Sequence, residues 1–305
     1  MTEPTPRAEE PDGAGPAPVA PPPTAIVERP GANVADPPTA NVPAPTPLWS
    51  QGAAIARSFL ADAGAGLVRI LYPPACAHCH GRSPGPMLCD TCRPAMLATA
   101  DMPVCPRCGA VVGPAAYLEK GCFLCRESRY AFERVVRLGR YEGELKHACL
   151  RIKDPRGSRL ATALADLLVE VQGAELRTLG ADLIVPIPLH WLRHWRRGYD
   201  QAGHLAQRLG LRLGLPVRAV LRRRRPTSPQ SELSPTERRR NVRGAFRVRP
   251  SPALQGASVL LVDDILTTGA TCHQAARVLR RAGARRVVVA VVARGDHVPN
   301  ILAAT

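Results

Sequence analysis

Apolar residues in the second half of the chain form short candidate strands that alternate with longer segments of helical periodicity. The candidate strands lie at residues 135–141, 183–187, 258–262 and 286–293, and the last three are continuous apolar runs. The segments with helical spacing lie at residues 144–152, 159–171, 201–213 and 271–282. Runs that are apolar throughout are typical of parallel strands covered on both faces. The alternation therefore predicts an α/β fold, in which right-handed crossovers join a mostly parallel sheet to flanking helices.

The first half of the chain has a different pattern. Residues 1–48 contain 14 of the 32 prolines and little apolar surface to bury, which predicts a disordered tail. Residues 53–71 carry apolar side chains at helical spacing before a Pro-Pro pair, which predicts a short amphipathic helix. A cysteine-rich stretch follows. We therefore expect a tail at 1–48, a helix with a cysteine module at 49–130, and the α/β domain at 131–305.

The formal charge of the chain is +16 at pH 7 and is unevenly spread. The tail holds six acids and two arginines, about −4, so the rest carries about +20. This excess favours polyanionic partners, either phosphorylated small molecules or nucleic acid, although free use of Arg in place of Lys produces the same balance. The chain does not begin with a basic segment followed by an apolar one, and Asp62 and Arg69 interrupt the apolar stretch at 59–71. We expect a cytoplasmic protein without a membrane span.

Eight of the ten cysteines stand in CxxC pairs. The pairs are Cys76/Cys79, Cys89/Cys92, Cys105/Cys108 and Cys122/Cys125. Two such pairs can place four thiolates around Zn²⁺. Nine residues separate the first two pairs and thirteen the last two, so sequential pairing gives two sites, while a cross-braced pairing of first with third is also open. Redox disulfides or an iron–sulfur cluster are alternatives, but the absence of a tight CxxCxxC run favours structural zinc.

The segment at residues 259–271 reads VLLVDDILTTGAT. The pattern predicts a buried strand with Asp263 and Asp264 at its carboxyl end, and then a turn at residues 265–266. The next helix opens with Thr267, Thr268, Gly269, Ala270 and Thr271. Free N–H groups, hydroxyl donors and a glycine suit a phosphate, while adjacent carboxylates suit a cis-diol or Mg²⁺. Together these groups predict a ribose 5-phosphate site. The alternative is a helix whose first turn is capped by threonine, but a cap needs only one such side chain.

Two basic segments are candidates for contacts with further phosphates. Residues 190–201 follow a predicted strand and contain Arg196 and Arg197, which suit a diphosphate group. The alternative is a solvated basic face with tryptophan packed on arginine stems. Residues 222–249 contain ten arginines and form either a mobile lid over substrate phosphates or a disordered basic linker.

The ordered set of motifs resembles the ComF family, the competence protein F relatives. The matching motifs are LYPPxC from residue 71, the CxxC pairs, IKD at 152–154, VPIPLH at 185–190, RRGYDQA at 196–202, TSPQ at 227–230, NVRGAF at 241–246 and VLLVDDILTTGAT. The resemblance covers about residues 53–294. It implies a type I phosphoribosyltransferase-like fold that binds phosphoribosyl diphosphate (PRPP) and Mg²⁺, beside a small zinc module.

The resemblance also implies roles for single residues. Asp263 and Asp264 would hold the ribose 2- and 3-hydroxyls as the catalytic pair, and residues 267–271 would wrap the 5-phosphate. Lys153, with Arg196 and Arg197, would contact the diphosphate. The family usually shows Gly-Phe-Asn-Gln where this chain has Gly-Tyr-Asp-Gln at 198–201, which adds a negative charge to the basic loop.

Two functions follow from these features. The first is phosphoribosyl transfer from PRPP, in nucleotide metabolism or in natural transformation. The second is non-catalytic binding of single-stranded DNA together with DNA-uptake proteins, with PRPP as a regulatory ligand and Trp191 and Trp195 as stacking platforms. The sequence does not identify an acceptor substrate or an oligomeric state.

Overall fold

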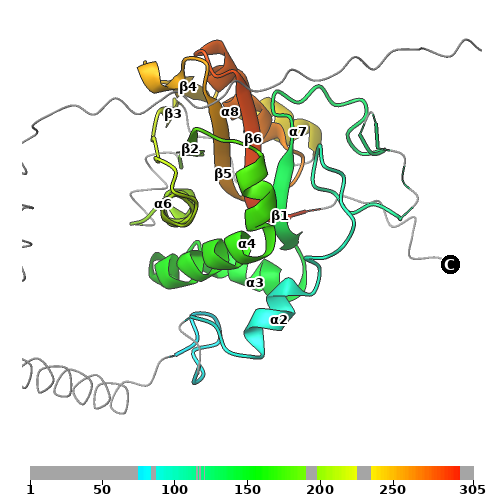
Figure 1. The fold of residues 1–305 in the computed structure, drawn as a ribbon, viewed down its shortest axis with the longest axis vertical. Helices are drawn as coiled ribbons and strands as arrows, with labels where there is room; N and C mark the ends of the chain where they lie inside the picture. Colours follow the sequence, from blue (N-terminus) through cyan, green and yellow to red (C-terminus); the bar gives the residue numbers. More distant parts are fainter. Residues whose placement is uncertain are drawn as a thin grey trace, which may run out of the picture. The chain divides into compact units, whose positions relative to one another are not determined.

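A four-stranded parallel sheet forms the centre of the protein (Figure 1). The computed structural model describes residues 75–83, 87–114, 116, 118–119, 121–189, 198–224 and 235–295, without the side chains of 235, 236, 238 and 239. The strands are β1 (Val135–Arg140), β2 (Leu183–Pro186), β5 (Ser258–Leu266) and β6 (Arg286–Arg294). Their order is β1-β6-β5-β2, and every neighbouring pair is parallel. All four predicted strands are confirmed.

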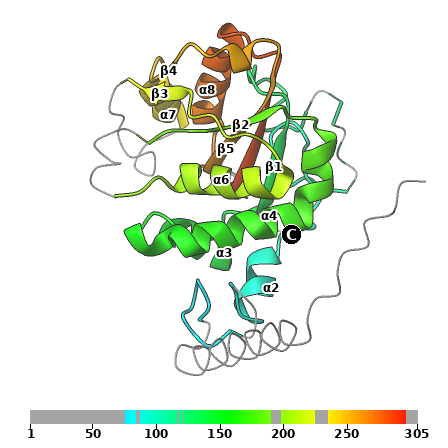
Figure 2. The ribbon, with the colours of Figure 1, turned by 60° about the vertical axis from the view of Figure 1, so that its left-hand side comes forward.

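Helices cover both faces of the sheet, as Figures 1 and 2 show. The helices are α3 (Gly143–Arg151), α4 (Ser158–Thr178), α6 (Gln201–Leu213) and α8 (Ala270–Arg281). Side chains alternate along β5, so Leu260 and Val262 pack in the core formed with α3, α4 and α6. Val259 and Leu261 pack in the opposite core with α8. The α/β prediction is confirmed, and α4 is longer than expected because buried leucines continue to Leu176.

The strand β5 corrects one expectation. Residues 265 and 266 do not turn the chain; they continue β5, so Asp263 and Asp264 lie inside the strand. Ile265 is paired with Ala293 and Leu266 with Arg294 of β6, and this pairing outweighs the poor strand preference of aspartate. The turn therefore begins at Thr267.

The described parts of the arginine-rich segment 222–249 contain regular elements, while residues 225–234, on which the predicted lid or linker falls, lie outside the described residues. The elements are β3 (Leu221–Arg223), α7 (Pro235–Val242) and β4 (Phe246–Val248). The strands β3 and β4 form an antiparallel pair, and Leu221 and Phe246 are buried in the α8-side core. The Arg223 guanidinium lies 5.2 Å from the centre of the Phe246 ring. Strands of three residues between arginines are too short to give an alternating pattern in the sequence.

In the described part of the cysteine module there is one short helix, α2 (Cys92–Leu97), which lies beside α3 in both ribbon views. Two single 3₁₀ turns, η1 (Pro155–Gly157) and η3 (Pro252–Leu254), complete the regular elements among the residues that the structure describes. Within the described ranges, no helix combines the length and apolarity needed to cross a bilayer. The predicted tail at 1–48 and the predicted helix at 53–71 lie outside those ranges.

Candidate functional site

The eight paired cysteines form two separate clusters. The first cluster is Cys76, Cys79, Cys89 and Cys92, and the second is Cys105, Cys108, Cys122 and Cys125. In each cluster the four Sγ atoms lie within 4.8 Å of one another. The pairing is therefore sequential, and the cross-braced alternative is wrong. All ten cysteines are free, so the pairs are not disulfides in this structure.

The spacing of the sulfur atoms fits zinc. Zn–S bonds of about 2.3 Å in a regular tetrahedron place the sulfurs about 3.8 Å apart. In the second cluster the Sγ atoms of Cys105 and Cys125 are 3.7 Å apart, and those of Cys108 and Cys122 are 3.6 Å apart. In the first cluster the Cys79–Cys89 distance is 3.7 Å.

Each cluster also contains a thiol that ionises readily. A hydrogen bond with Cys108 lowers the pKa of the Cys105 thiol to about 4. Burial acts to raise the pKa of Cys76, but backbone N–H donors at Cys89 and neighbouring residues outweigh it and lower that pKa to about 6. Thiolates are the form that binds metal, so both sets can hold a zinc ion.

The first cluster contacts α3. His78 Nε2 lies 2.7 Å from the Glu144 carboxylate, and Arg151 contacts the His78 carbonyl and the His80 ring. Neither histidine belongs to a cluster.

The second cluster contacts the sheet itself. Arg294 Nε, at the end of β6, donates to the Cys108 carbonyl at 2.8 Å. Arg137 Nε, in β1, donates to the Gly109 carbonyl at 3.1 Å. Both arginines are at least 96% buried, being 4% and 3% exposed, so these contacts belong to the core of the fold.

The two predicted carboxylates lie near the carboxyl end of β5, where ligands bind in open α/β sheets. Because successive strand residues face opposite sides, Asp264 points to the α3 side and Asp263 to the α8 side. Asp264 is buried, and its Oδ2 lies 3.6 Å from Lys153 Nζ. Its Oδ1 accepts the Ile265 N–H at 2.9 Å, while Asp263 Oδ1 accepts the Asp264 N–H at 3.0 Å.

Asp263 occupies an electrostatically unfavourable position. Burial, and next the negative charge of Asp264, raise the pKa of Asp263 well above its usual value, and the positive charge of Arg223 offsets this only in part. A carboxyl group held in this way is typical of functional sites, where a ligand or cation compensates the charge.

The turn after β5, residues 267–269, is called the Thr-Gly turn here. Gly269 caps α8 with φ +73°, a conformation that glycine adopts without strain. A Cβ at this position would come within 3.0 Å of the Tyr130 ring, so the turn also requires the absence of a side chain. Thr268 Oγ1 accepts the Ala270 N–H at 3.4 Å. The first N–H groups of α8 therefore start directly beside the two carboxylates.

Lys153 follows α3 and reaches this site, as its contact with Asp264 shows. Arg196 and Arg197 lie outside the described residues. Both segments that flank their loop are held near the site. Ile187 N–H donates to the Val262 carbonyl at 2.9 Å, and the Tyr199 hydroxyl donates to the Ile152 carbonyl. The tyrosine that departs from the family pattern thus makes a bond that phenylalanine would not make.

Residues 195–298 match the phosphoribosyl transferase domain model. The chain is 35% identical over 206 residues to "DNA utilization protein YhgH" of Salmonella typhimurium, covering 66% of this chain and 88% of that protein. It is 31% identical over 228 residues to "Competence protein F" of Haemophilus influenzae, covering 72% and 96%. The chain belongs to the ComF family.

A solved structure of glutamine PRPP amidotransferase from B. subtilis is 22% identical to this ComF chain, covering 45% of this chain and 27% of that one. The TM-score of this match is 0.31, which is too low for the match to support the fold. The type I phosphoribosyltransferase fold of the ComF chain therefore rests on the domain match and on the sheet topology.

Two side chains near the ComF site were not anticipated from the sequence. Tyr130 donates its hydroxyl to the Thr268 carbonyl at 3.1 Å, and Arg294 contacts the Leu266 carbonyl at 3.4 Å. No sequence signal marks them, because their partners lie 28 to 138 residues away. Arg223, from the arginine-rich segment 222–249, supplies positive charge near Asp263. Burial raises the pKa of the Cys272 thiol, which faces the core rather than the start of α8.

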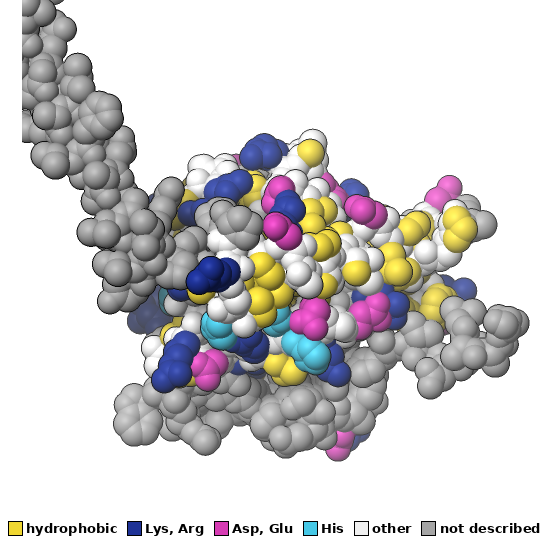
Figure 3. Space-filling view, turned by 90° about the horizontal axis from the view of Figure 1, so that it is seen from below, with side chains coloured by type: hydrophobic (Ala, Val, Ile, Leu, Met, Phe, Trp, Pro, Cys, Tyr) yellow, Lys and Arg dark blue, Asp and Glu magenta, His cyan; other side chains and the backbone are white. Residues whose placement is uncertain are grey.

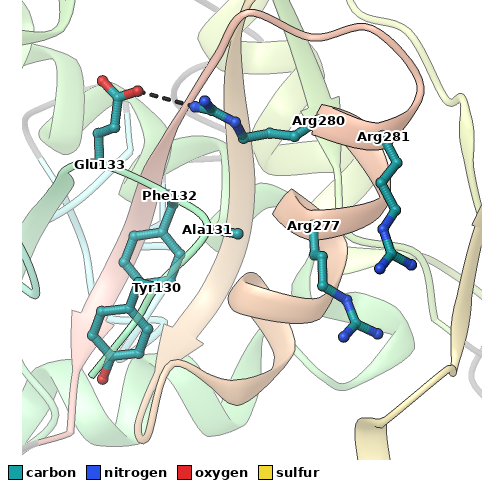
Figure 4. A pocket seen from close by; sticks show the side chains of 7 residues that line it. All are labelled: Tyr130, Ala131, Phe132, Glu133, Arg277, Arg280 and Arg281. Carbon is teal, nitrogen blue, oxygen red and sulfur yellow. Dashed lines mark hydrogen bonds and ion pairs between the residues drawn. The ribbon is translucent and has the colours of Figure 1, made fainter. Parts of the chain in front are cut away.

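An open hollow of about 550 Å³ lies between residues 130–133 and the last turns of α8 (Figure 4). Arg280 lies across one end and pairs with Glu133 at 3.1 Å. Arg277 and Arg281 extend away from Glu133, on the other side of the hollow from the aromatic rings. By contrast, the face seen in Figure 3 shows basic, acidic and histidine side chains interspersed. This ComF protein therefore has a basic hollow in addition to the carboxylate pair of β5.

Proposed function

We propose that this protein is a cytoplasmic phosphoribosyltransferase that binds PRPP with Mg²⁺. The observation that carries the proposal is the pair Asp263 and Asp264 at the end of β5, directly before the glycine-capped start of α8. The raised pKa of Asp263, caused mainly by burial, supports a ligand that compensates its charge.

The parts of PRPP match the chemistry of the site in order. The ribose 2- and 3-hydroxyls donate to Asp263 and Asp264. The 5-phosphate accepts from the N–H and hydroxyl groups of residues 267–271. The diphosphate lies toward Lys153 and the loop that carries Arg196 and Arg197. Mg²⁺, when bound, neutralises charge on the diphosphate. Carboxylate and phosphate oxygens are the ligands that suit this ion.

The reaction is a displacement at the anomeric carbon of the ribose. A nucleophile donates its lone pair to form a bond to that carbon, and the bond to diphosphate breaks with its electrons leaving on the diphosphate oxygen. Positive charge develops on the ribose during this exchange. The two carboxylates, of which Asp264 is buried and Asp263 partly exposed, stabilise that charge because backbone N–H donors already fix them in position.

The test is calorimetry of PRPP binding in the presence of Mg²⁺. Replacing both carboxylates, Asp263→Asn with Asp264→Asn, should weaken binding by at least about a hundredfold, since two charge-assisted contacts are lost. The matched control is Asp101→Asn with Glu127→Gln, which removes the same charge from exposed positions. Equal affinity of the two double variants would contradict the proposal.

The hollow lined by Arg277, Arg280 and Arg281 favours a second candidate function. This function is the binding of single-stranded DNA, with PRPP as a regulatory ligand. The names of the relatives, "DNA utilization protein" and "Competence protein F", support it, as does the net charge of +16. Phosphate contacts would give an affinity that falls steeply with added salt. Steep salt dependence, together with no diphosphate release from PRPP with nucleobase or amine acceptors, would favour this candidate; absence of DNA binding would exclude it.

A further inference from the structure

Arg294 connects the second cysteine cluster to the Thr-Gly turn. Its Nε donates to the Cys108 carbonyl at 2.8 Å, inside a metal-binding knuckle. Its Nη1 donates to the Leu266 carbonyl at 3.4 Å, the last residue before the turn. The side chain is 4% exposed, so water does not replace these contacts readily. One buried guanidinium therefore links the knuckle directly to the start of the turn, where the Leu266 carbonyl also accepts the Gly295 N–H at 2.8 Å.

Tyr130 makes a second connection from the same cluster. It follows Cys125 by five residues and packs against the apolar groups of the second cluster. Its hydroxyl donates to the Thr268 carbonyl at 3.1 Å, and its ring fills the space beside Gly269. Phe132 holds the ring in place by stacking, with ring centres 4.5 Å apart (Figure 4). The carbonyls on both sides of Thr267 thus accept from residues fixed to the second cluster.

The segment that carries Tyr130 is also attached to α8. The Ala131 N–H donates to His273 Nδ1 at 3.1 Å, in the first turn of the helix. Burial, and next the charge of Arg277, lower the pKa of His273, which keeps the ring neutral and able to accept. The first turn of α8 and the Thr-Gly turn are therefore held from the same side.

We propose that Arg294 and Tyr130 are positioning residues, through which the second cysteine cluster sets the conformation of the Thr-Gly turn for phosphate binding. Neither residue needs to touch the ligand. The inference rests on the proposed PRPP site, because it assigns the 5-phosphate to this turn. It gives the second zinc site a role in ligand affinity besides its role in stability.

The experiment compares Tyr130→Phe with Thr162→Val in the full chain. Each change removes one hydroxyl that donates to a backbone carbonyl, and Thr162 lies in α4 at a distance from the turn. Three quantities are measured: zinc per chain, amide hydrogen exchange at residues 267–271 without ligand, and PRPP affinity with Mg²⁺. For Tyr130→Phe we expect unchanged zinc, exchange in the turn about fivefold faster, and PRPP affinity about fivefold weaker. For Thr162→Val the turn should exchange as in the wild type.

A second variant, Arg294→Lys, keeps the charge but loses the forked contact with two carbonyls. It should speed exchange in the same residues; if it does not fold, Tyr130→Phe still decides the question. Exchange and affinity in Tyr130→Phe equal to wild type would overturn the inference, as would an increase spread over the whole sheet. A wild-type protein that does not bind PRPP would instead contradict the proposed function, while the exchange rates would still test the coupling.

Discussion

The two cysteine clusters have the same ligand set and nearly the same spacing, but they differ in their surroundings. In the first cluster Cys79 is exposed and Cys89 is only partly buried. In the second cluster all four cysteines are buried. The first cluster reaches the domain through the partly exposed pairs Arg93–Glu170 and His78–Glu144, of which only His78 is buried, while Cys76 and Cys92 pack in the α3-side core. The second reaches it through arginines that are almost fully buried.

This difference indicates different energetic weights. Exposed ion pairs contribute about 0–1 kcal/mol, whereas removing the partner of a buried charge costs about 3–5 kcal/mol. The first cluster therefore has one exposed side, at Cys79 and Cys89, and packs on its other side in the core with α3, the helix that precedes Lys153. The second cluster is buried throughout as a separate apolar cluster, which Arg137 and Arg294 join to the sheet. The same sequence motif thus serves two structural roles, and burial distinguishes them.

Replacing a cysteine in each cluster should produce the largest difference. Cys108→Ser removes a buried ligand and, by disturbing the knuckle, weakens the contacts of Arg294 and Arg137 with the Cys108 and Gly109 carbonyls. We expect it to lower Tm by roughly 10–20 °C, from a loss of about 5 kcal/mol. Cys79→Ser should lower Tm by less than half as much. Thermal denaturation with zinc analysis measures both, and equal losses of Tm would remove the distinction between the clusters.

Zinc release should separate the clusters without mutation. A chelator in excess should remove one zinc per chain quickly and the other at least about tenfold more slowly, because a buried site opens only by local unfolding. The fast phase belongs to the exposed first cluster, so Cys79→Ser should eliminate it. Release in a single phase would show that both sites open together. A colorimetric zinc indicator follows the time course.

Lys153 follows α3, the helix that the first cluster contacts, so replacing it tests the side of the site next to the first cluster. Lys153→Met keeps the length of the side chain but removes the charge 3.6 Å from Asp264. We expect PRPP affinity to fall by about 5- to 20-fold, since one charged contact is lost. Lys146→Met, at an exposed position of α3, is the matched control and should bind as wild type. Calorimetry distinguishes the two variants.

Replacing Asp263 should have the smallest effect on thermal stability, and it should raise Tm rather than lower it. Its pKa is raised, mainly by burial, so the folded protein holds this proton more tightly than the unfolded chain does. Wild-type stability is therefore lost as pH rises from the usual aspartate range through the raised pKa. Asp263→Asn should raise Tm by about 2–4 °C at neutral pH, with the gain disappearing toward pH 4, while PRPP binding is lost. A variant less stable than wild type at pH 7 would contradict this.

Much of this arrangement is readable from the sequence, where local patterns suffice. The valine-rich run of β6 identifies a buried parallel strand, and the order of carboxylates, threonines and glycine identifies the candidate site. The end of β5 is not readable, because its pairing with β6 decides where the strand stops. The link from Arg294 to Cys108 spans 186 residues and leaves no local trace. The partition of cysteines into two clusters depends on how the knuckles fold, which spacing alone leaves open.

The position of β6 has a consequence for the order of folding. It follows every other described strand in the chain, yet it lies inside the sheet, between β1 and β5. During synthesis the cysteine knuckles emerge early and can close on zinc through short-range contacts, while the sheet must wait for its inner strand. Arg294 is the last residue of that strand. The ligand site is therefore assembled in one late step, when β6 enters the sheet and its final residue contacts a zinc knuckle that has already formed.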